Sequence, residues 1–334
     1  MTAQDTAPQT PAASPLILGT MGWGDVERAR GALRAGLEAG IGLLDTADIY
    51  GAGASEETVG ALLAELDPAE RTRLRVQTKS GIVLHEPGPD GTPAVRYDNS
   101  PAYLHDRLAL SLERLGLDRV DTLVVHRPDV LTPVSDTVRA FLDAREAGRV
   151  DALGVSNMGT RRVLEYQHAL REVSADGTGL ACVQVELGLH HRMLVESVVL
   201  ANHPAAAPDG GAGDLGEVCA GEGIEIQAWG PLGQGRFTRG SDGTVPADPA
   251  EQAALAAAGG APAVVARVAR ELEVSREAVV LAWLLRLPWG VRPVVGTQDP
   301  ARIASCAQAA DAAARMDGAQ WHRLWTAARG ETLP

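Results

Sequence analysis

The sequence predicts an α/β protein with the fold of a (β/α)8 barrel of the TIM type, formed by a single domain. Eight short apolar segments alternate with longer segments of helical periodicity, which is the pattern of parallel βα units. Eight such units over about 300 residues favour a closed barrel. No G-x-G-x-x-G motif follows the first apolar segment, so the open dinucleotide-binding sheet, the other candidate, lacks its best signature.

The chain is expected to begin with a short disordered tail. Residues 1–14 are rich in Thr, Ala, Pro and Gln, and they have neither the basic nor the apolar region of a signal peptide. The barrel is predicted over residues 15–330. Its strands are expected at residues 16–18, 42–44, 74–76, 122–125, 152–155, 182–185, 224–226 and 291–295.

Helices between these strands are marked by periodicity or by their boundaries. Residues 26–39 carry one apolar stripe, as expected of a helix packed on a sheet. Ser100 and Pro101 form an N-cap and first-turn pair, which predicts a helix that ends near Leu115. Ser275 is likewise predicted to cap a strongly apolar helix.

Three longer inserts follow predicted strands. Residues 84–97 are rich in Pro, Gly and Asp and predict a short hairpin or loop after the third strand. Residues 202–214 predict a flexible loop after the sixth strand. Residues 233–260 form a long Gly- and Ala-rich insert after the seventh, and the Ala-rich segment 247–263 is expected to be a loop or a short helix. Because all three follow strands, they are expected at the carboxyl-terminal face, where barrel enzymes form their active sites.

The composition is that of an ordinary globular protein and narrows the expected partners. The chain has 334 residues, 45% of them hydrophobic and 22% charged, and a formal net charge of −13. No block of basic residues and no run of 18 apolar residues occurs, so neither nucleic acid nor a membrane is expected as a partner. Three scattered cysteines without a CxxC spacing favour a reducing cytoplasm and predict no disulfide scaffold and no metal site. We expect a monomer or a small homo-oligomer.

Position 79 holds a lysine in a chain whose other basic residues of the Lys and Arg type are all arginines. Of the 30 Lys and Arg residues, only Lys79 is a lysine. An ammonium is a compact point charge that fits where a planar guanidinium does not. The alternative is that a single surface lysine has survived by chance.

Four polar residues lie at predicted strand ends on one rim of the barrel. Asp45 ends the second strand and Tyr50 lies in the loop after it, while Lys79 ends the third strand and His126 the fourth. An ammonium held by a carboxylate is expected to stabilise a neighbouring phenolate and to lower the tyrosine pKa from about 10. A histidine opposite could orient a carbonyl group. The set predicts proton donation to an oxygen atom.

These residues lie in segments that resemble the aldo-keto reductase superfamily, with the bacterial predicted oxidoreductases as the nearest branch. The segments occur in the family's order over residues 16–314. They are DTADIYG, the lysine of the third strand, LVVHRPD, GVSN, VQVE, AWGPLGQGRF and VVGT. Since every segment occurs in order, the resemblance is more specific than any one motif.

The resemblance implies a (β/α)8 barrel that uses NADP(H) to reduce aldehydes or ketones to alcohols, with a small carbonyl or alcohol as substrate. It assigns Tyr50 as the general acid, Lys79 and Asp45 as the groups that tune it, and His126 as the group that orients the carbonyl. The alternative is a cofactor-sensing regulatory subunit with the same fold. The intact acid system favours the enzyme.

The same resemblance implies where the cofactor binds. Ser156, Asn157 and Gln184 are expected at the nicotinamide carboxamide, and Trp229 is expected to stack on the ring. The expected cofactor residues are Gly19, Thr20, Met21, Ser156, Asn157, Gln184, Trp229, Gly230, Pro231, Leu232, Gly233, Gly235, Gly296, Thr297 and Arg302.

Two departures from the family concern the adenosine 2′-phosphate. Many members have Lys where Gly296 stands, and Glu-Asn where Ser305 and Cys306 stand. The phosphate is therefore expected to rely on Thr297 and Arg302, with Gln298 as a further candidate, which still favours NADPH over NADH.

Overall fold

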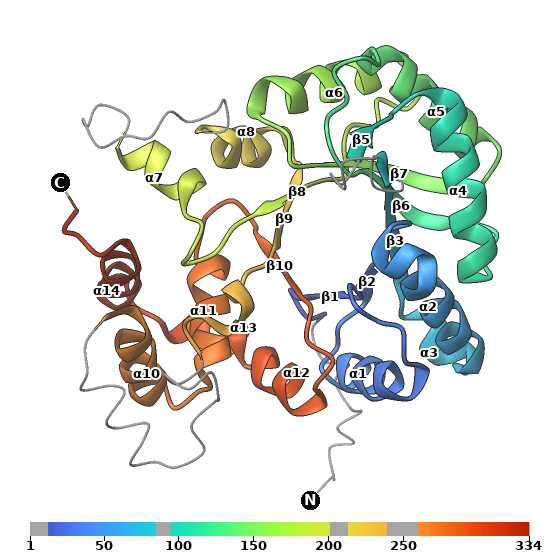
Figure 1. Ribbon diagram of the computed structural model, residues 1–334. Helices are drawn as coiled ribbons and strands as arrows, with labels where there is room; N and C mark the ends of the chain where they lie inside the picture. The colour runs from blue at the N-terminus through green and yellow to red at the C-terminus, as the bar shows by residue number, and fades with distance from the viewer. Residues whose placement is uncertain (1–12, 85–94, 201–212, 239–259, 334) are drawn as a thin grey trace, which may run out of the picture.

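Eight parallel strands close into a barrel in the computed structural model (Figure 1), which describes residues 13–84, 95–200, 213–238 and 260–333. In order around the barrel they are β1 (Ile17–Gly19), β10 (Arg292–Val295), β9 (Glu225–Trp229), β8 (Cys182–Glu186), β7 (Val150–Ser156), β6 (Val120–Val125), β3 (Arg75–Ser80) and β2 (Leu43–Asp45). The predicted fold is confirmed, and each predicted apolar segment forms a barrel strand. β3 ends at Ser80, one residue beyond the predicted strand end at Lys79, and its polar residues 77–80 are buried.

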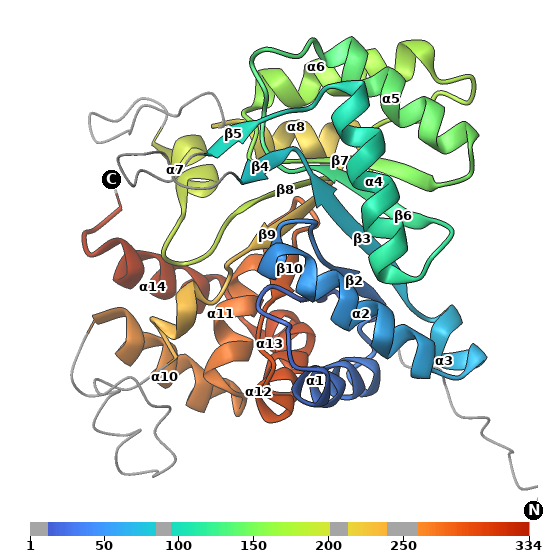
Figure 2. The ribbon, with the colours of Figure 1, turned by 45° about the vertical axis from the view of Figure 1, so that its right-hand side comes forward.

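Helices surround the barrel. They are α1 (Val26–Glu38), α2 (Ala54–Glu65), α3 (Pro68–Thr72), α4 (Pro101–Leu115), α5 (Val134–Glu146), α6 (Thr160–Val173), α7 (Met193–Val199), α8 (Leu215–Glu222), α10 (Gly260–Leu272), α11 (Arg276–Leu285), α12 (Pro300–Ala307), α13 (Ala309–Arg315) and α14 (Gly318–Arg329). The predicted caps are confirmed: Ser100 accepts a hydrogen bond from the Tyr103 amide and Ser275 from the Ala278 amide. Figure 2 shows α2, α4 and α5 following one another along the outside of the barrel. None of these described helices is long and apolar enough to cross a membrane.

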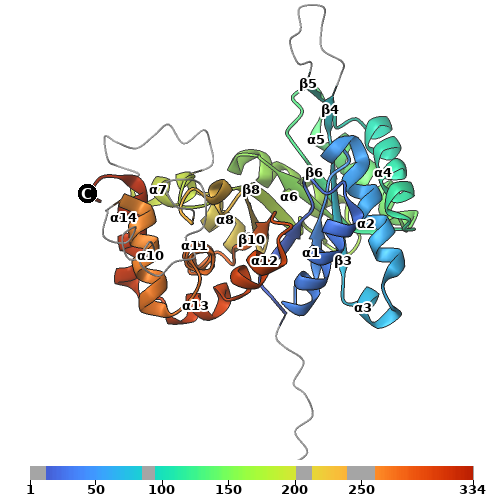
Figure 3. The same cartoon turned by 60° about the horizontal axis from the view of Figure 1, so that its bottom comes forward.

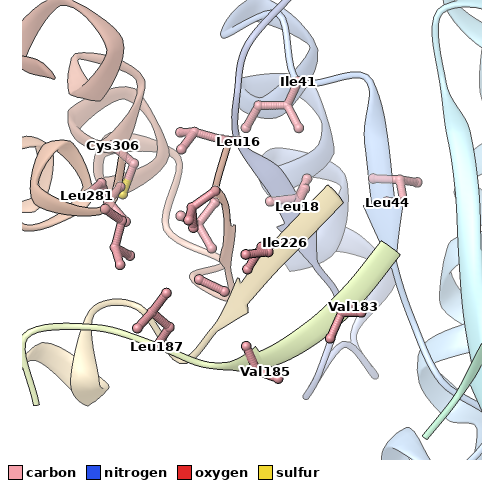
Figure 4. Close-up of a cluster of buried hydrophobic side chains, with 14 of the residues drawn as sticks. Leu16, Leu18, Ile41, Leu44, Val183, Val185, Leu187, Ile226, Leu281 and Cys306 are labelled. Atoms are coloured by element: carbon pink, nitrogen blue, oxygen red, sulfur yellow. The ribbon is translucent and has the colours of Figure 1, made fainter. Parts of the chain in front are cut away.

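The main hydrophobic core lies between the strands and the surrounding helices, because successive strand residues point to opposite faces. Figure 4 shows this packing for one side of the barrel. The side chains labelled there are Leu16, Leu18, Ile41, Leu44, Val183, Val185, Leu187, Ile226, Leu281 and Cys306. A separate small cluster of Ile17, Leu43 and Val294 belongs to the opposite face of β1, β2 and β10.

The predicted hairpin after the third strand is present. β4 (Ile82–Leu84) and β5 (Val95–Tyr97) pair antiparallel, and Figure 3 shows them projecting from one end of the barrel. Residues 1–12 of the predicted tail, 85–94 of the hairpin, and 202–212 and 239–259 of the two predicted loops lie outside the described residues. The described part of the last insert includes a short 3₁₀ turn, η2 (Gly233–Gly235).

The packing of α2 on α4 requires a glycine at position 60. A Cβ there would lie 2.4 Å from the carbonyl oxygen of Arg114, a backbone atom of α4. At Gly31 of α1, the nearest atom to a Cβ is Cγ of Pro300 at 3.4 Å, an ordinary contact.

These two glycines should respond to alanine with opposite signs. Gly60→Ala should lower the free energy of unfolding by about 1–3 kcal/mol, because the backbone of α4 cannot move aside cheaply. Gly31→Ala should raise it by about 0.5–1 kcal/mol, because alanine favours the helix and meets no obstacle. Equilibrium unfolding in denaturant measures both, and equal effects would contradict the close approach of α2 to α4.

Candidate active site

The carboxyl ends of the barrel strands surround a cavity of about 740 Å³, a size typical of small-molecule sites. The predicted site residues that line it are Gly19, Met21, Asp45, Tyr50, His126, Ser156, Asn157, Gln184, Trp229, Gly230, Pro231, Leu232, Gly233, Gly235, Gly296, Thr297 and Arg302. The other two, Thr20 and Lys79, are fully buried beside it. Thr20 donates from its hydroxyl to the main-chain oxygen of Asp45 at 3.1 Å. It therefore helps to hold the backbone of Asp45 in place.

Lys79 lies next to Tyr50 with all of its donors occupied. Its Nζ is 2.7 Å from Oδ1 of Asp45, 2.8 Å from the main-chain oxygen of Thr46 and 3.3 Å from the Tyr50 hydroxyl oxygen. An ammonium has three N–H groups, so each one has an acceptor. Since the Tyr50 oxygen accepts from Lys79, its own O–H remains free to donate, and no acceptor for it is found among the described residues. Tyr50 lines the cavity.

Burial and the neighbouring charges act against each other on the pKa values of Lys79 and Tyr50. Burial alone would lower the pKa of Lys79, but attraction to Asp45 and Tyr50 outweighs it and raises that pKa, so Lys79 is charged. Burial raises the pKa of Tyr50 more than nearby Lys79 lowers it. The expectation of a tyrosine pKa below 10 is therefore wrong, because a phenolate here loses more hydration than the ammonium replaces. Tyr50 is in its protonated form at neutral pH.

His126 completes the predicted catalytic set as a neutral imidazole. Its ring lies edge-on to that of Tyr50, with centroids 6.0 Å apart. Burial, with the neighbouring charges of Lys79 and Arg127, lowers the pKa of His126 to about 3. A neutral imidazole keeps one N–H to donate to an oxygen atom and brings no charge into the cavity.

The loop that carries Tyr50 is held by α4. Arg107 donates from Nε to Oδ2 of Asp48 at 2.7 Å. Arg114 donates to the main-chain oxygens of Asp48 and Ala52 at 3.1 and 3.3 Å and to the carboxylate of Glu56 at 3.3 Å. Burial raises the pKa of Asp48 to about 6, although Arg107 opposes this. No local pattern in the sequence indicates these contacts, because the two arginines lie 58 to 66 positions from their partners.

Trp229 and Asn157, which also line the cavity, are joined by a hydrogen bond that orients the Asn157 side chain. The indole N–H of Trp229 donates to Oδ1 of Asn157 at 3.0 Å. The amide nitrogen of Asn157 donates to Oγ of Ser156 at 2.8 Å and to the main-chain oxygen of His126 at 3.2 Å. Asn157 also has a left-handed backbone conformation, with φ of 58°. Three predicted cofactor residues and a predicted catalytic residue are thus joined in one network.

Glycines allow the loop after β9 to run along the cavity wall. Gly230, Gly233 and Gly235 have φ values of 64°, 52° and 86°, which favour glycine. At Gly233 a Cβ would also lie 3.0 Å from Nδ1 of His190. The loop therefore requires glycine at these positions, and its three glycines line the cavity.

Arginines line the cavity as well. Arg302 lines it as predicted, and its Nη2 lies 3.4 Å from a carboxylate oxygen of Glu277. Arg28 and Arg127 also line it and were missed. Arg127 directly follows His126 and could have been found by its position, whereas Arg28 lies on α1 and carried no signal. Other lining residues that were not predicted are Ile49, Gln234, Val294 and Val295.

Comparison with known proteins places this site in a family. The model of the Aldo/keto reductase family matches residues 15–326. A 6-dehydroglucose reductase of Novosphingobium aromaticivorans is 34% identical over 308 residues, which cover 90% of this chain and 86% of that protein. A second 6-dehydroglucose reductase, from Agrobacterium fabrum, is 32% identical over 301 residues, covering 90% and 88%.

Solved structures are similar over nearly the whole chain. An aldo-keto reductase from Klebsiella pneumoniae in complex with NADPH superposes with a TM-score of 0.66 at 24% identity, covering 94% of this chain and 92% of that one. A glycerol dehydrogenase from Gluconobacter oxydans superposes with a TM-score of 0.68 at 25% identity, covering 90% and 88%. With a family model that spans the barrel and relatives above 30% identity, the chain belongs to the aldo/keto reductase family.

Proposed function

We propose that the protein is an NADP(H)-dependent oxidoreductase that reduces aldehydes or ketones to alcohols, with Tyr50 as the proton donor. The observation that carries the proposal is the Lys79 ammonium, whose three N–H groups point to Asp45, Thr46 and Tyr50. This arrangement leaves the Tyr50 O–H as the donor on the cavity side, with a cation beside the oxygen where negative charge develops.

The chain's own groups account for the proton and for the orientation of the carbonyl. Tyr50 is protonated at neutral pH and gives its proton to the carbonyl oxygen, while Lys79 stabilises the phenolate that forms. His126 is neutral and can donate an N–H to the same oxygen. Asp45 keeps Lys79 charged and in place.

The residues that line the cavity fit NADP(H). Ser156, Asn157 and Gln184 would hold the carboxamide, and Trp229 offers an aromatic face to the ring. The bound nicotinamide would supply the hydride. The glycine-rich loop 230–235 admits close approach of a pyrophosphate, and Thr297 and Arg302 would hold the 2′-phosphate. The NADPH complex of the Klebsiella relative supports this assignment.

A regulatory subunit with the same fold is the less favoured alternative. Such a protein needs to bind the cofactor but has no need of a proton donor. Here all four residues are present: Lys79 contacts both Asp45 and Tyr50. The ring of His126 lies edge-on to that of Tyr50. The intact set favours an enzyme.

The relatives suggest the first substrate to test. Two of them are named 6-dehydroglucose reductases, so 6-dehydroglucose should be assayed beside simple aliphatic and aromatic aldehydes and ketones. Each compound should be tested with NADPH and with NADH. Oxidation of NADPH by at least one of them is expected, and no oxidation by any would contradict the enzyme.

Tyr50→Phe should lower turnover by about 10²- to 10⁴-fold, because it removes the proton donor and keeps the ring. The affinity for NADPH, measured by fluorescence titration, should change little. Tyr166→Phe is the matched control, since Tyr166 is a buried tyrosine of α6 that does not line the cavity. Wild-type turnover in Tyr50→Phe would exclude Tyr50 as the proton donor.

His126 should make the protein less stable in acid. Its pKa is lowered from 6.5 to about 3, so between these pH values the unfolded chain binds more protons, and the free energy of unfolding falls as the pH falls. From pH 6.5 to pH 4 this loss amounts to about 3 kcal/mol. Asp48, with its pKa raised to about 6, acts in the opposite direction and is unchanged in the variants.

Denaturant unfolding at several pH values of the wild type, His126→Gln and a control isolates this effect. His126→Gln should flatten the acid loss by about the amount above. His322→Gln, at an exposed histidine of α14, should retain it. Parallel pH curves for the wild type and His126→Gln would show that His126 is not held neutral.

A further inference from the structure

Three glutamines fill the barrel interior beneath the cavity. Gln77 of β3, Gln184 of β8 and Gln227 of β9 are at most 2% exposed. We call them the amide layer. The interior of such barrels is usually filled by branched apolar side chains, and a buried amide without partners is costly. Three buried amides at this position are therefore stable only if their N–H and C=O groups find hydrogen-bond partners.

Every N–H of the amide layer has an acceptor. Gln77 donates to Oδ1 of Asp45 at 2.5 Å and to Oε1 of Gln227 at 2.7 Å. Gln227 donates to Oε1 of Gln77 at 3.0 Å and to Oε1 of Glu225 at 2.9 Å. Gln184 donates to Oδ1 of Asp45 at 2.9 Å and to Oε1 of Gln227 at 3.0 Å. Each amide has two N–H hydrogens, so all are used.

Carboxylates at both ends fix the direction of these hydrogen bonds. Asp45 is paired with Lys79 and Glu225 with Arg292, at 2.7 and 3.1 Å. An ionised carboxylate only accepts, so the amide nitrogens must face Asp45 and Glu225. The one amide oxygen of the layer without a partner among the described residues is Oε1 of Gln184. Gln184 lines the cavity.

We propose that Gln77, Gln227 and Glu225 are positioning residues that, together with Asp45, commit Gln184 to offer an acceptor, and no donor, to the cavity: Asp45 accepts one N–H of Gln184 and Gln227 the other. This inference rests on the proposed function. It means that the protein recognises the nicotinamide by accepting a hydrogen bond from the amino group of its carboxamide. Neither Gln77, Gln227 nor Glu225 lines the cavity, so they act through Gln184. A ligand without that amino group leaves a buried acceptor unpaired.

A cofactor analogue isolates this one contact. The 3-acetylpyridine analogue of NADP⁺ carries a methyl group in place of the carboxamide amino group and is otherwise the same. Equilibrium titration of tryptophan fluorescence gives the Kd of each dinucleotide without any turnover. The wild type should bind the analogue about tenfold or more weakly than NADP⁺.

Glu225→Gln tests the layer with an isosteric change away from the cavity. Arg292 can only donate, so the new amide must turn its oxygen to Arg292 and its nitrogen to Gln227. Gln227 must then turn in order to accept, so it presents its nitrogen, in place of its oxygen, to both Gln77 and Gln184. The N–H of Gln184 that Gln227 accepted loses its partner, while Asp45 still accepts the other. Gln184 can then turn the released N–H to the cavity, and the preference for NADP⁺ should fall to about threefold or less.

Gln227→Met is the second variant, because it removes the same acceptor of Gln184 directly. Glu222→Gln is the matched control. Glu222 also accepts from a buried glutamine, Gln167 at 3.3 Å, and pairs with Arg171 at 2.5 Å, but Gln167 lies outside the cavity lining. This control should keep the wild-type preference, and melting temperatures establish that each variant is folded.

The outcomes separate the inference from the proposed function. Loss of the preference in Glu225→Gln and Gln227→Met, with the preference kept in Glu222→Gln, supports the inference. A preference that is absent in the wild type, or is unchanged in folded Glu225→Gln and Gln227→Met, overturns it while the proposed function stands. If the wild type binds neither dinucleotide, the proposed function fails, and the inference fails with it.

Discussion

The ion pair between Lys79 and Asp45 is the constraint on which the rest of the site depends. Lys79 is fully buried and Asp45 almost so, with their charged atoms 2.7 Å apart. Losing one partner of such a pair leaves an uncompensated buried charge, at a cost of about 3–5 kcal/mol. The pair therefore fixes β2 and β3 relative to each other at their carboxyl ends. It also places a compact cation beside Tyr50, which explains a lysine in a chain whose other cations are arginines.

Around this pair, hydrogen bonds rather than apolar contacts set the roles of the groups. The occupied donors of Lys79 leave the Tyr50 O–H for the cavity side. Asp45 in turn accepts from Gln77 and Gln184, so the carboxylate that holds the cation also orients the amide of Gln184, which lines the cavity. From outside the barrel, α4 holds the loop of Tyr50 through its arginines. The proposed proton donor and the proposed nicotinamide end of the cavity thus depend on the same buried carboxylate.

The fold and the convergence of the four catalytic candidates were predictable because the strands are apolar segments that end in polar residues. Gln77 could also have been found, since it lies two residues before Lys79 on one strand and so shares its face. The raised pKa of Tyr50 could not be predicted, because the depth of burial depends on packing. The Arg302–Glu277 pair joins two separate helices, and no local pattern in the sequence indicates it. Local sequence thus specified the elements and strand ends, while desolvation and hydrogen-bond direction required the three-dimensional structure.

The most direct test of the account is the single-turnover rate of Lys79→Arg with bound NADPH, because this variant keeps the charge and changes only its shape. A guanidinium is larger and planar, and it cannot place three N–H groups on Asp45, Thr46 and Tyr50 as the ammonium does. We expect a folded protein that binds NADPH normally and reduces its substrate at least about 10²-fold more slowly. A rate near that of the wild type would contradict it, since a positive charge of any shape beside Tyr50 would then suffice.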